Sequence, residues 1–237
     1  MAPALVLLHG FTHTGRSWDA VAAALGERYR ALAPDIRGHG AASEATPVTL
    51  EAVLSDIDGL APGPFAIAGY SMGGRLALHY ALARPKRVAR LALIGASPGL
   101  EDPGERAARL HADERLAREI EGLSVGDFAA RWAATPVLSD QPAHVRARAH
   151  ADRLRNKPGG LARALRGLGT GALPPVWQRL WELQMPVLMI VGERDDKFRE
   201  IAHRMHGALP RGRLEIVAGA GHAAHLERPR DVAALIG

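Results

Sequence analysis

The stretch Gly69-Tyr70-Ser71-Met72-Gly73-Gly74-Arg75 decides the fold. It follows an apolar run at residues 65–68 and precedes a long apolar segment with helical spacing at residues 76–83. Strand, Gly-x-Ser-x-Gly and helix in this order are typical of a nucleophile elbow, a sharp turn that exposes a serine hydroxyl at its tip. Gly69 and Gly73 supply the nearly bare positions that such a turn requires. Ser71 is therefore a candidate nucleophile, and the alternative is that it only caps the following helix.

The composition is that of an ordinary globular protein. Of 237 residues, 47% are hydrophobic and 23% are charged, which predicts one domain with room for an inserted lobe. No run approaches the ~18 uninterrupted apolar residues of a spanning helix, and no basic leader or cleavage site precedes the first apolar run. The absence of cysteine excludes disulfides, thiolate catalysis and sulfur-ligated metals. We therefore expect a cytoplasmic protein without a membrane span.

The formal net charge of +5 comes from an excess of arginine, since the chain has only three lysines, Lys86, Lys157 and Lys197. A basic chain suggests a nucleic-acid partner. Here the arginines are scattered, without a basic run and with little aromatic interleaving, so we expect no such partner. Arginine also binds carboxylates in two-point fashion. Composition alone does not separate that role from a coding bias toward alanine and arginine.

Strand and helix patterns alternate along most of the chain, which favours a parallel sheet with right-handed crossovers. Between residues 98 and 183 no strand pattern occurs, and alanine, leucine and arginine follow helical spacing instead. A structureless loop of this length inside a domain would be unusual. We therefore predict a sheet core formed by residues 1–97 and 184–237, with residues 98–183 inserted as a helical cap. The strands are expected at residues 4–8, 30–33, 65–68, 88–94, 187–191 and 214–217. The main core helices are expected near residues 17–25, 50–60, 76–83 (stopping at Pro85), 198–209 and from 229.

A serine hydroxyl becomes reactive only when an oriented imidazole can take its proton. Among eleven histidines, His222 follows the last predicted strand in a glycine-rich loop, where it can reach back over the carboxyl edge of the sheet. His225 is expected in or near the final helix, and His203 and His206 resemble ordinary helix residues. We therefore choose His222 as the candidate base.

The orienting carboxylate should follow the next-to-last strand, where the sequence reads Gly192-Glu193-Arg194-Asp195-Asp196. Asp195 is the first choice and Asp196 is the alternative. A third interpretation is that the segment is only a solvated charged turn without a catalytic role. The order Ser71, Asp195, His222 is that of the α/β-hydrolase fold. We predict this fold with a six-stranded, mainly parallel sheet that lacks the usual first hairpin.

Backbone N–H groups of Phe11 and Met72 are the predicted oxyanion hole, because one follows the first strand and the other follows the nucleophile. The segment 69–74 does not fit the Gly-x-Gly-x-x-Gly pattern, so phosphate binding is disfavoured. A serine at the elbow also excludes chemistry that uses an aspartate nucleophile. We expect neither a metal nor an organic cofactor.

Arg75 lies four residues after Ser71, on the same helix face one turn further on. A cation in the first turn opposes the helix dipole, at a cost of about 0.3–1 kcal/mol. Most esterases have no need of a guanidinium at this position. Arg75 either turns outward to a surface carboxylate or binds the substrate, and the second interpretation predicts an anionic ligand.

Four groups of motifs extend the pattern over most of the chain, including the insertion: Gly-Tyr-Ser-Met-Gly-Gly-Arg at 69–75, Ser-Pro-Gly-Leu at 97–100 with Glu-Arg-Ala-Ala-Arg at 105–109, Phe-Ala-Ala-Arg-Trp at 128–132, and Gly-Glu-Arg-Asp-Asp-Lys-Phe at 192–198. Together they resemble the 2-succinyl-6-hydroxy-2,4-cyclohexadiene-1-carboxylate (SHCHC) synthases of menaquinone biosynthesis. The resemblance implies a lyase that eliminates pyruvate from 2-succinyl-5-enolpyruvyl-6-hydroxy-3-cyclohexene-1-carboxylate, a tri-carboxylate, without a cofactor.

The resemblance also implies site residues. By motif, Arg75, Arg109 and Arg153 would bind the substrate carboxylates, with Arg155 competing for the same alignment position as Arg153. Tyr70 and Trp132 would line the pocket. By themselves, Arg109 and Arg153 read as solvated helix residues.

Two other functions stay open from the sequence. One is a serine hydrolase of a small anionic ester, or of a carbon–carbon bond beside a ketone. The other is a non-catalytic ligand receptor, which a complete Ser-Asp-His set disfavours. The sequence predicts no particular oligomeric state.

Overall fold

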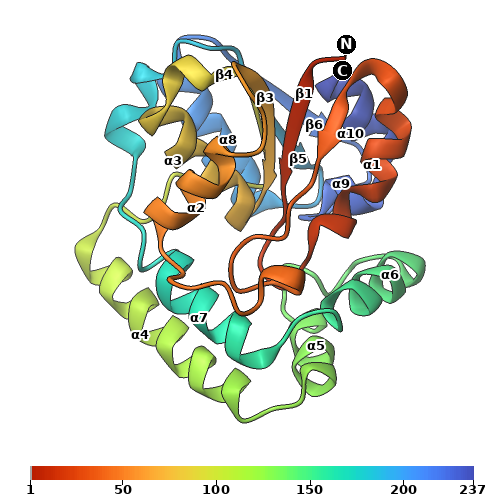
Figure 1. Cartoon of the computed structure of the whole chain (residues 1–237), viewed down its shortest axis with the longest axis vertical. Coiled ribbons are helices and arrows are strands. Elements are labelled where there is room, and N and C mark those ends of the chain that lie inside the picture. The colour runs from red at the N-terminus through yellow and green to blue at the C-terminus, as the bar shows by residue number, and fades with distance from the viewer. Residues whose placement is uncertain (1) are drawn as a thin grey trace.

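The computed structural model describes residues 2–237 and contains one sheet of six strands (Figure 1). All five neighbouring pairs are parallel, and the strand order is β2-β1-β3-β4-β5-β6. The predicted six-stranded α/β architecture is confirmed. The strands are β1 (Ala4–Leu8), β2 (Arg30–Leu32), β3 (Phe65–Tyr70), β4 (Val88–Ile94), β5 (Val187–Gly192) and β6 (Gly212–Val217).

Helices cover both faces of the sheet, so its strands are apolar on both sides. Alternate residues of β1 enter different cores: Val6 and Leu8 pack on one face, and Leu5 and Leu7 on the other. The first face is covered by α2 (Leu50–Asp58), α3 (Met72–Ala83) and α8 (Asp196–Ala208), and the second by α1 (Asp19–Leu25), α9 (Ala224–Glu227) and α10 (Pro229–Ile236).

The part of the segment between β4 and β5 that ends at residue 168 lies across the carboxyl ends of the strands, at the bottom of Figure 1, and the rest returns along the sheet to β5. It contains α4 (Pro103–Glu121), α5 (Val125–Ala133), α6 (Ala143–Arg153), α7 (Pro158–Leu168) and the short 3₁₀ helix η5 (Trp177–Glu182). Helices α4, α5 and α7 share a small core of their own, in which Ile120, Phe128 and Leu161 are buried. The segment therefore forms the roof over the sheet edge where a catalytic site is expected.

One local prediction differs from the structure. The first helix does not begin at Ser17: a 3₁₀ turn covers Gly15–Trp18, and Thr14 is its cap residue, accepting a hydrogen bond from the N–H of Arg16. The Ser17 hydroxyl instead donates back to the carbonyl of Thr14 at 2.8 Å. His225 lies near the final helix, in the single-turn helix α9 that directly precedes it. No helix in the described part of the chain is long and apolar enough to cross a membrane.

The elbow between β3 and α3 is as tight as the sequence predicts. Ser71 has φ +51° and ψ −108°, a backbone conformation that residues other than glycine rarely adopt. A Cβ atom added to Gly69 would lie 2.3 Å from the carbonyl oxygen of Gly73, and one added to Gly73 would lie 2.2 Å from that of Leu8. Both glycines are therefore required by the close approach of three backbone segments.

Substitution of Gly73 tests this constraint. We expect Gly73→Ala to lower the free energy of unfolding by about 1–3 kcal/mol, because the added methyl group meets backbone that cannot rotate away. Gly207→Ala is the control, since nothing lies within 4 Å of a Cβ at that helical position, and it should be neutral or stabilising. Urea denaturation of both variants measures the difference, and equal stabilities would contradict the packing argument.

Candidate active site

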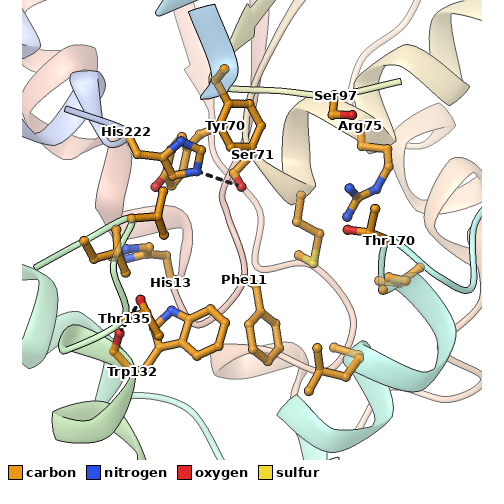
Figure 2. A pocket seen from close by; sticks show the side chains of 18 of the residues that line it. Phe11, His13, Tyr70, Ser71, Arg75, Ser97, Trp132, Thr135, Thr170 and His222 are labelled. Carbon is orange, nitrogen blue, oxygen red and sulfur yellow. Dashed lines mark hydrogen bonds between the residues drawn. The ribbon is translucent and has the colours of Figure 1, made fainter. Parts of the chain in front are cut away.

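Ser71, His222 and Asp195 meet at the carboxyl edge of the sheet. The Ser71 hydroxyl lies 3.2 Å from Nε2 of His222, and Nδ1 of the same ring lies 2.7 Å from Oδ2 of Asp195 (Figure 2). His222 and Asp195 are both 6% exposed. Ser71 occupies the N-cap position of α3, but its side chain makes no capping hydrogen bond. The geometry is that of a nucleophile, an imidazole base and an orienting carboxylate.

The two neighbouring aspartates have different surroundings. Asp195 is buried against His222, whereas the side chain of Asp196 is 87% exposed and pairs with Arg199 at 3.0 Å. Asp196 is the first residue of α8, where a carboxylate interacts favourably with the helix dipole. Of the two candidates, Asp195 is the one that contacts the imidazole.

Backbone hydrogen bonds hold the histidine loop. The N–H of Gly221 donates to Glu227 at 3.0 Å, and the N–H of Arg194 donates to the carbonyl of Ala220 at 2.9 Å. The His222 ring itself packs between aromatic neighbours, with the ring centre of Phe198 4.4 Å away and that of Tyr70 5.2 Å away. The imidazole is thus fixed by its loop and by packing as well as by Asp195.

The predicted oxyanion donors face the same space. Phe11 and Met72 both line the cavity above Ser71, and the described residues give their N–H groups no hydrogen-bond acceptor. His9 fixes the peptide between Gly10 and Phe11: its Nδ1–H donates to the Gly10 carbonyl at 2.9 Å, while its Nε2 accepts from the N–H of Ile36 at 2.9 Å. Burial lowers the pKa of His9 to about 4, so the ring is neutral, as these two bonds require. Because the C=O and N–H of a trans peptide point in opposite directions, anchoring the Gly10 carbonyl also sets the direction of the Phe11 N–H.

A cavity of about 270 Å³ opens above Ser71, between the sheet edge and the cap. The core contributes Ser71, His222 and Phe198, and the cap contributes Trp132 and Leu165, among others. Three of its lining residues are cationic, namely Arg75, Arg109 and Lys197, and none of its described lining residues is acidic. The cavity is therefore suited to an anion.

Arg75 points into this cavity rather than to a surface carboxylate (Figure 2). It is 7% exposed, its Nε has no partner, and the described residues provide it with no salt bridge. Burial, and secondarily the nearby Arg109, lowers the pKa of Arg75 to about 10. It thus stays protonated at neutral pH. Asp113, which pairs directly with Arg109, favours this charge only from beyond salt-bridge distance, so the buried guanidinium is left to pair with an anionic ligand.

The other predicted arginines lie in different places. Arg109 lines the cavity with its side chain 43% exposed, and its Nε donates to Asp113 at 2.8 Å. Arg153 is 1% exposed and outside the cavity lining, its two Nη atoms are unpartnered, and its Nε donates to the Thr12 hydroxyl at 3.3 Å. Arg155 has a side chain that is 48% exposed and lies 4.0 Å from Asp152. Of the two rivals for one alignment position, Arg153 is therefore the buried one.

Tyr70 and Trp132 also line the cavity. Two further lining residues were missed as site residues in the sequence analysis. The sequence indicated no site role for Lys197, which was named only as one of the three lysines and within the motif at residues 192–198. Its position two residues after Asp195 could have predicted that it lies at the site. His13 carried no signal, because its partner Asp152 is 139 residues away along the chain. Among residues 2–237, no cluster of three or more His, Asp or Glu side chains could hold a metal ion.

Fold and site together define a protein of the α/β-hydrolase fold class, with a parallel sheet, a nucleophile elbow and a Ser-His-Asp set in the expected chain order. A family model described as the Alpha/beta hydrolase family matches residues 5–235. A Bacillus subtilis (strain 168) protein, provisionally named 2-succinyl-6-hydroxy-2,4-cyclohexadiene-1-carboxylate synthase, is 40% identical over 96% of this chain and 86% of its own length. A Salmonella agona (strain SL483) protein named as the same synthase is 32% identical over 98% of this chain and 91% of its own.

A solved structure agrees with these relatives. MenH from S. aureus superposes with a TM-score of 0.93 at 28% identity, covering 99% of this chain and 91% of that one. The chain belongs to the α/β-hydrolase family and, within it, to the family of the SHCHC synthases.

The two aspartates provide a matched test of the triad. We expect Asp195→Asn to lower kcat by about 10⁴-fold, because the amide favours the wrong imidazole tautomer and cannot stabilise an imidazolium. Asp196→Asn should leave kcat within about twofold, since that side chain is exposed and away from His222. Steady-state kinetics of both variants compare the two, and comparable losses would refute the assignment of Asp195.

Proposed function

We propose that this chain is an SHCHC synthase that eliminates pyruvate from 2-succinyl-5-enolpyruvyl-6-hydroxy-3-cyclohexene-1-carboxylate, with the Ser71-His222-Asp195 set as its base. The observation that carries the proposal is Arg75, a buried guanidinium that makes no salt bridge within the described residues and lies one helical turn after Ser71. A neutral ester would leave this charge uncompensated, whereas a carboxylate would pair with it. The names of the relatives point to the same substrate class.

The cations of the cavity match a tri-carboxylate in number. Arg75, Arg109 and Lys197 all line it, and each charge-assisted hydrogen bond to a carboxylate contributes about 1.5–3 kcal/mol. Tyr70 and Trp132 form part of the wall around the ligand. The family resemblance implies that Arg153 binds a substrate carboxylate, and we keep this role in the proposal. Because its Nη atoms are buried outside the cavity in this conformation, the cavity wall would have to rearrange before Arg153 could contact the substrate.

The reaction needs a base and a site for an enolate oxygen. Ser71, with its proton passed to His222, removes the proton on the ring carbon beside the succinyl ketone. The Phe11 and Met72 N–H groups stabilise the enolate oxygen that forms. The electron pair then shifts along the ring, the 3-ene becomes the 2,4-diene, and the carbon–oxygen bond breaks. The enolate of pyruvate leaves and takes up a proton. Atoms balance without water, so no acyl-enzyme is required.

The location follows from the same proposal. A synthase of a small multiply charged acid works where its substrate is made, and the chain has no cysteine that would require an oxidising compartment. We therefore assign it to the cytoplasm.

Activity on the named precursor is the direct test. Purified protein should release pyruvate and build up the absorbance of a conjugated diene, and Ser71→Ala should nearly abolish both. Rapid turnover of p-nitrophenyl acetate without diene formation would favour a serine hydrolase instead. Ligand binding without any turnover by the wild type would favour a receptor.

Arg75 separates the tri-acid from a neutral substrate. We expect Arg75→Ala to lower kcat/KM for the precursor by about 10–150-fold, the equivalent of one lost charge-assisted hydrogen bond. Hydrolysis of p-nitrophenyl acetate should change by less than about threefold. Arg118→Ala is the control, because that arginine is 73% exposed on α4. Equal losses on the two substrates would show that Arg75 does not bind a carboxylate.

A further inference from the structure

A second histidine–carboxylate pair faces the cavity, away from Arg75. Nδ1 of His13 lies 2.9 Å from Oδ2 of Asp152, which is on the cap helix α6. His13 is 2% exposed, yet it lines the cavity, and its Nε2 makes no hydrogen bond within residues 2–237. In Figure 2, His13 and Trp132 lie on one side of Ser71, and Arg75 and Thr170 on the other.

Asp152 fixes the tautomer of this ring. Its carboxylate also accepts from the backbone N–H of Thr14 at 3.0 Å and from the Thr14 hydroxyl. A carboxylate with three donors around it is ionised, and these contacts lower the pKa of Asp152 despite its burial. Nδ1 of His13 therefore carries the proton, and Nε2 presents either a lone pair or a second proton to the cavity.

The charges around His13 favour the lone pair. An imidazolium here would have Asp152 as its counter-ion, but the nearby charge of Arg153 on α6 opposes a second positive charge beside that carboxylate. The other titratable neighbours are His9 after β1, Tyr70 on β3, and His222 and His225 on the loop and helix after β6, and none of them supplies a further negative charge to this ring at neutral pH. Burial correspondingly lowers the pKa of His13.

We propose that His13, oriented by Asp152, is a substrate-binding residue whose Nε2 accepts a hydrogen bond from a hydroxyl group of the ligand. This inference rests on the proposed function and extends it. The precursor carries three carboxylates, a ketone and an enol ether, all of which only accept hydrogen bonds at neutral pH. Its ring hydroxyl is its one donor. The cations that line the cavity bind the acceptors, and His13 provides an acceptor for this donor.

Two succinyl compounds isolate the hydroxyl. The product SHCHC keeps the ring hydroxyl, whereas 2-succinylbenzoate has the same two carboxylates and the ketone but no hydroxyl. Their dissociation constants can be measured by calorimetry for the wild type and for variants at position 13. The ratio of the two constants removes effects that both ligands share.

The variants separate the two ring nitrogens. In His13→Asn the amide can keep the bond to Asp152 while the Nε2 acceptor is lost, and in His13→Gln the amide oxygen can take the place of Nε2. We expect His13→Asn to reduce the preference for SHCHC by about three- to tenfold, the equivalent of one neutral hydrogen bond. Binding of 2-succinylbenzoate should stay within about twofold, and His13→Gln should recover most of the preference. His144→Leu, on the exposed side of α6, is the control and should change neither constant.

The outcomes distinguish the two levels of the proposal. Pyruvate release by the wild type, together with an unchanged ratio in His13→Asn, overturns the role of His13 and leaves the synthase intact. Equal weakening of both ligands also overturns it, because His13 would then only shape the wall. A wild type that binds neither compound and releases no pyruvate refutes the synthase, and the role of His13 with it.

Discussion

The contact between the start of α3 and the end of β1 determines the rest of the site. A Cβ at Gly73 would lie 2.2 Å from the carbonyl of Leu8 and 2.5 Å from that of His9, so the helix begins almost in backbone contact with the neighbouring strand. Ser71 has its positive φ at this point of close approach, and Met72 and Phe11 both line the cavity above it. The proposed nucleophile and the proposed oxyanion donors thus depend on one packing constraint, which only glycine satisfies. His9 adds a second constraint, because its Nδ1–H binds the carbonyl of the Gly10–Phe11 peptide and so fixes the direction of the Phe11 N–H.

Arg75 shows what this arrangement costs the free protein. A guanidinium with a pKa lowered to about 10 binds its proton less well in the folded than in the unfolded chain. The sign follows from linkage: stability increases with pH only between about 10 and the ordinary arginine value, and at neutral pH the full penalty is present. A bound carboxylate offsets that penalty. Relief of the desolvation cost of Arg75 therefore contributes to the affinity for an anion. The paired arginines of the surface, such as Arg166 with Glu114 and Glu121, carry no such penalty.

The strands of the sheet could be predicted from the sequence because they follow local rules, and the order of the candidate site residues could be predicted from the fold class. Apolar runs bounded by turns located the strands, and the chain order of Ser71, Asp195 and His222 is a property of the fold. It could not decide whether Arg75 turns inward, or whether Arg153 or Arg155 is buried, since packing between distant segments sets those orientations. The pairing of His13 with Asp152 joins the first loop to α6, and no local pattern indicates it. The start of the first helix was misplaced because Thr14 and Ser17 are both residue types that cap helices well. Thr14 caps the 3₁₀ turn at Gly15–Trp18, which includes Ser17.

The same three side chains would serve a hydrolase or a lyase, so the cavity has to decide between them. A hydrolase needs Ser71 to approach a carbonyl carbon, and an elimination needs it to approach a carbon-bound proton next to a carbonyl. An oxyanion hole stabilises the tetrahedral oxyanion of the first reaction and the enolate oxygen of the second equally well. What differs is the placement of the substrate, and charged groups at fixed positions place a multiply charged ligand in one orientation. With cations along the cavity and the proposed hydrogen-bond acceptor at His13, a multiply charged ligand would be bound at several points around Ser71, and its orientation would select the atom that the base can reach.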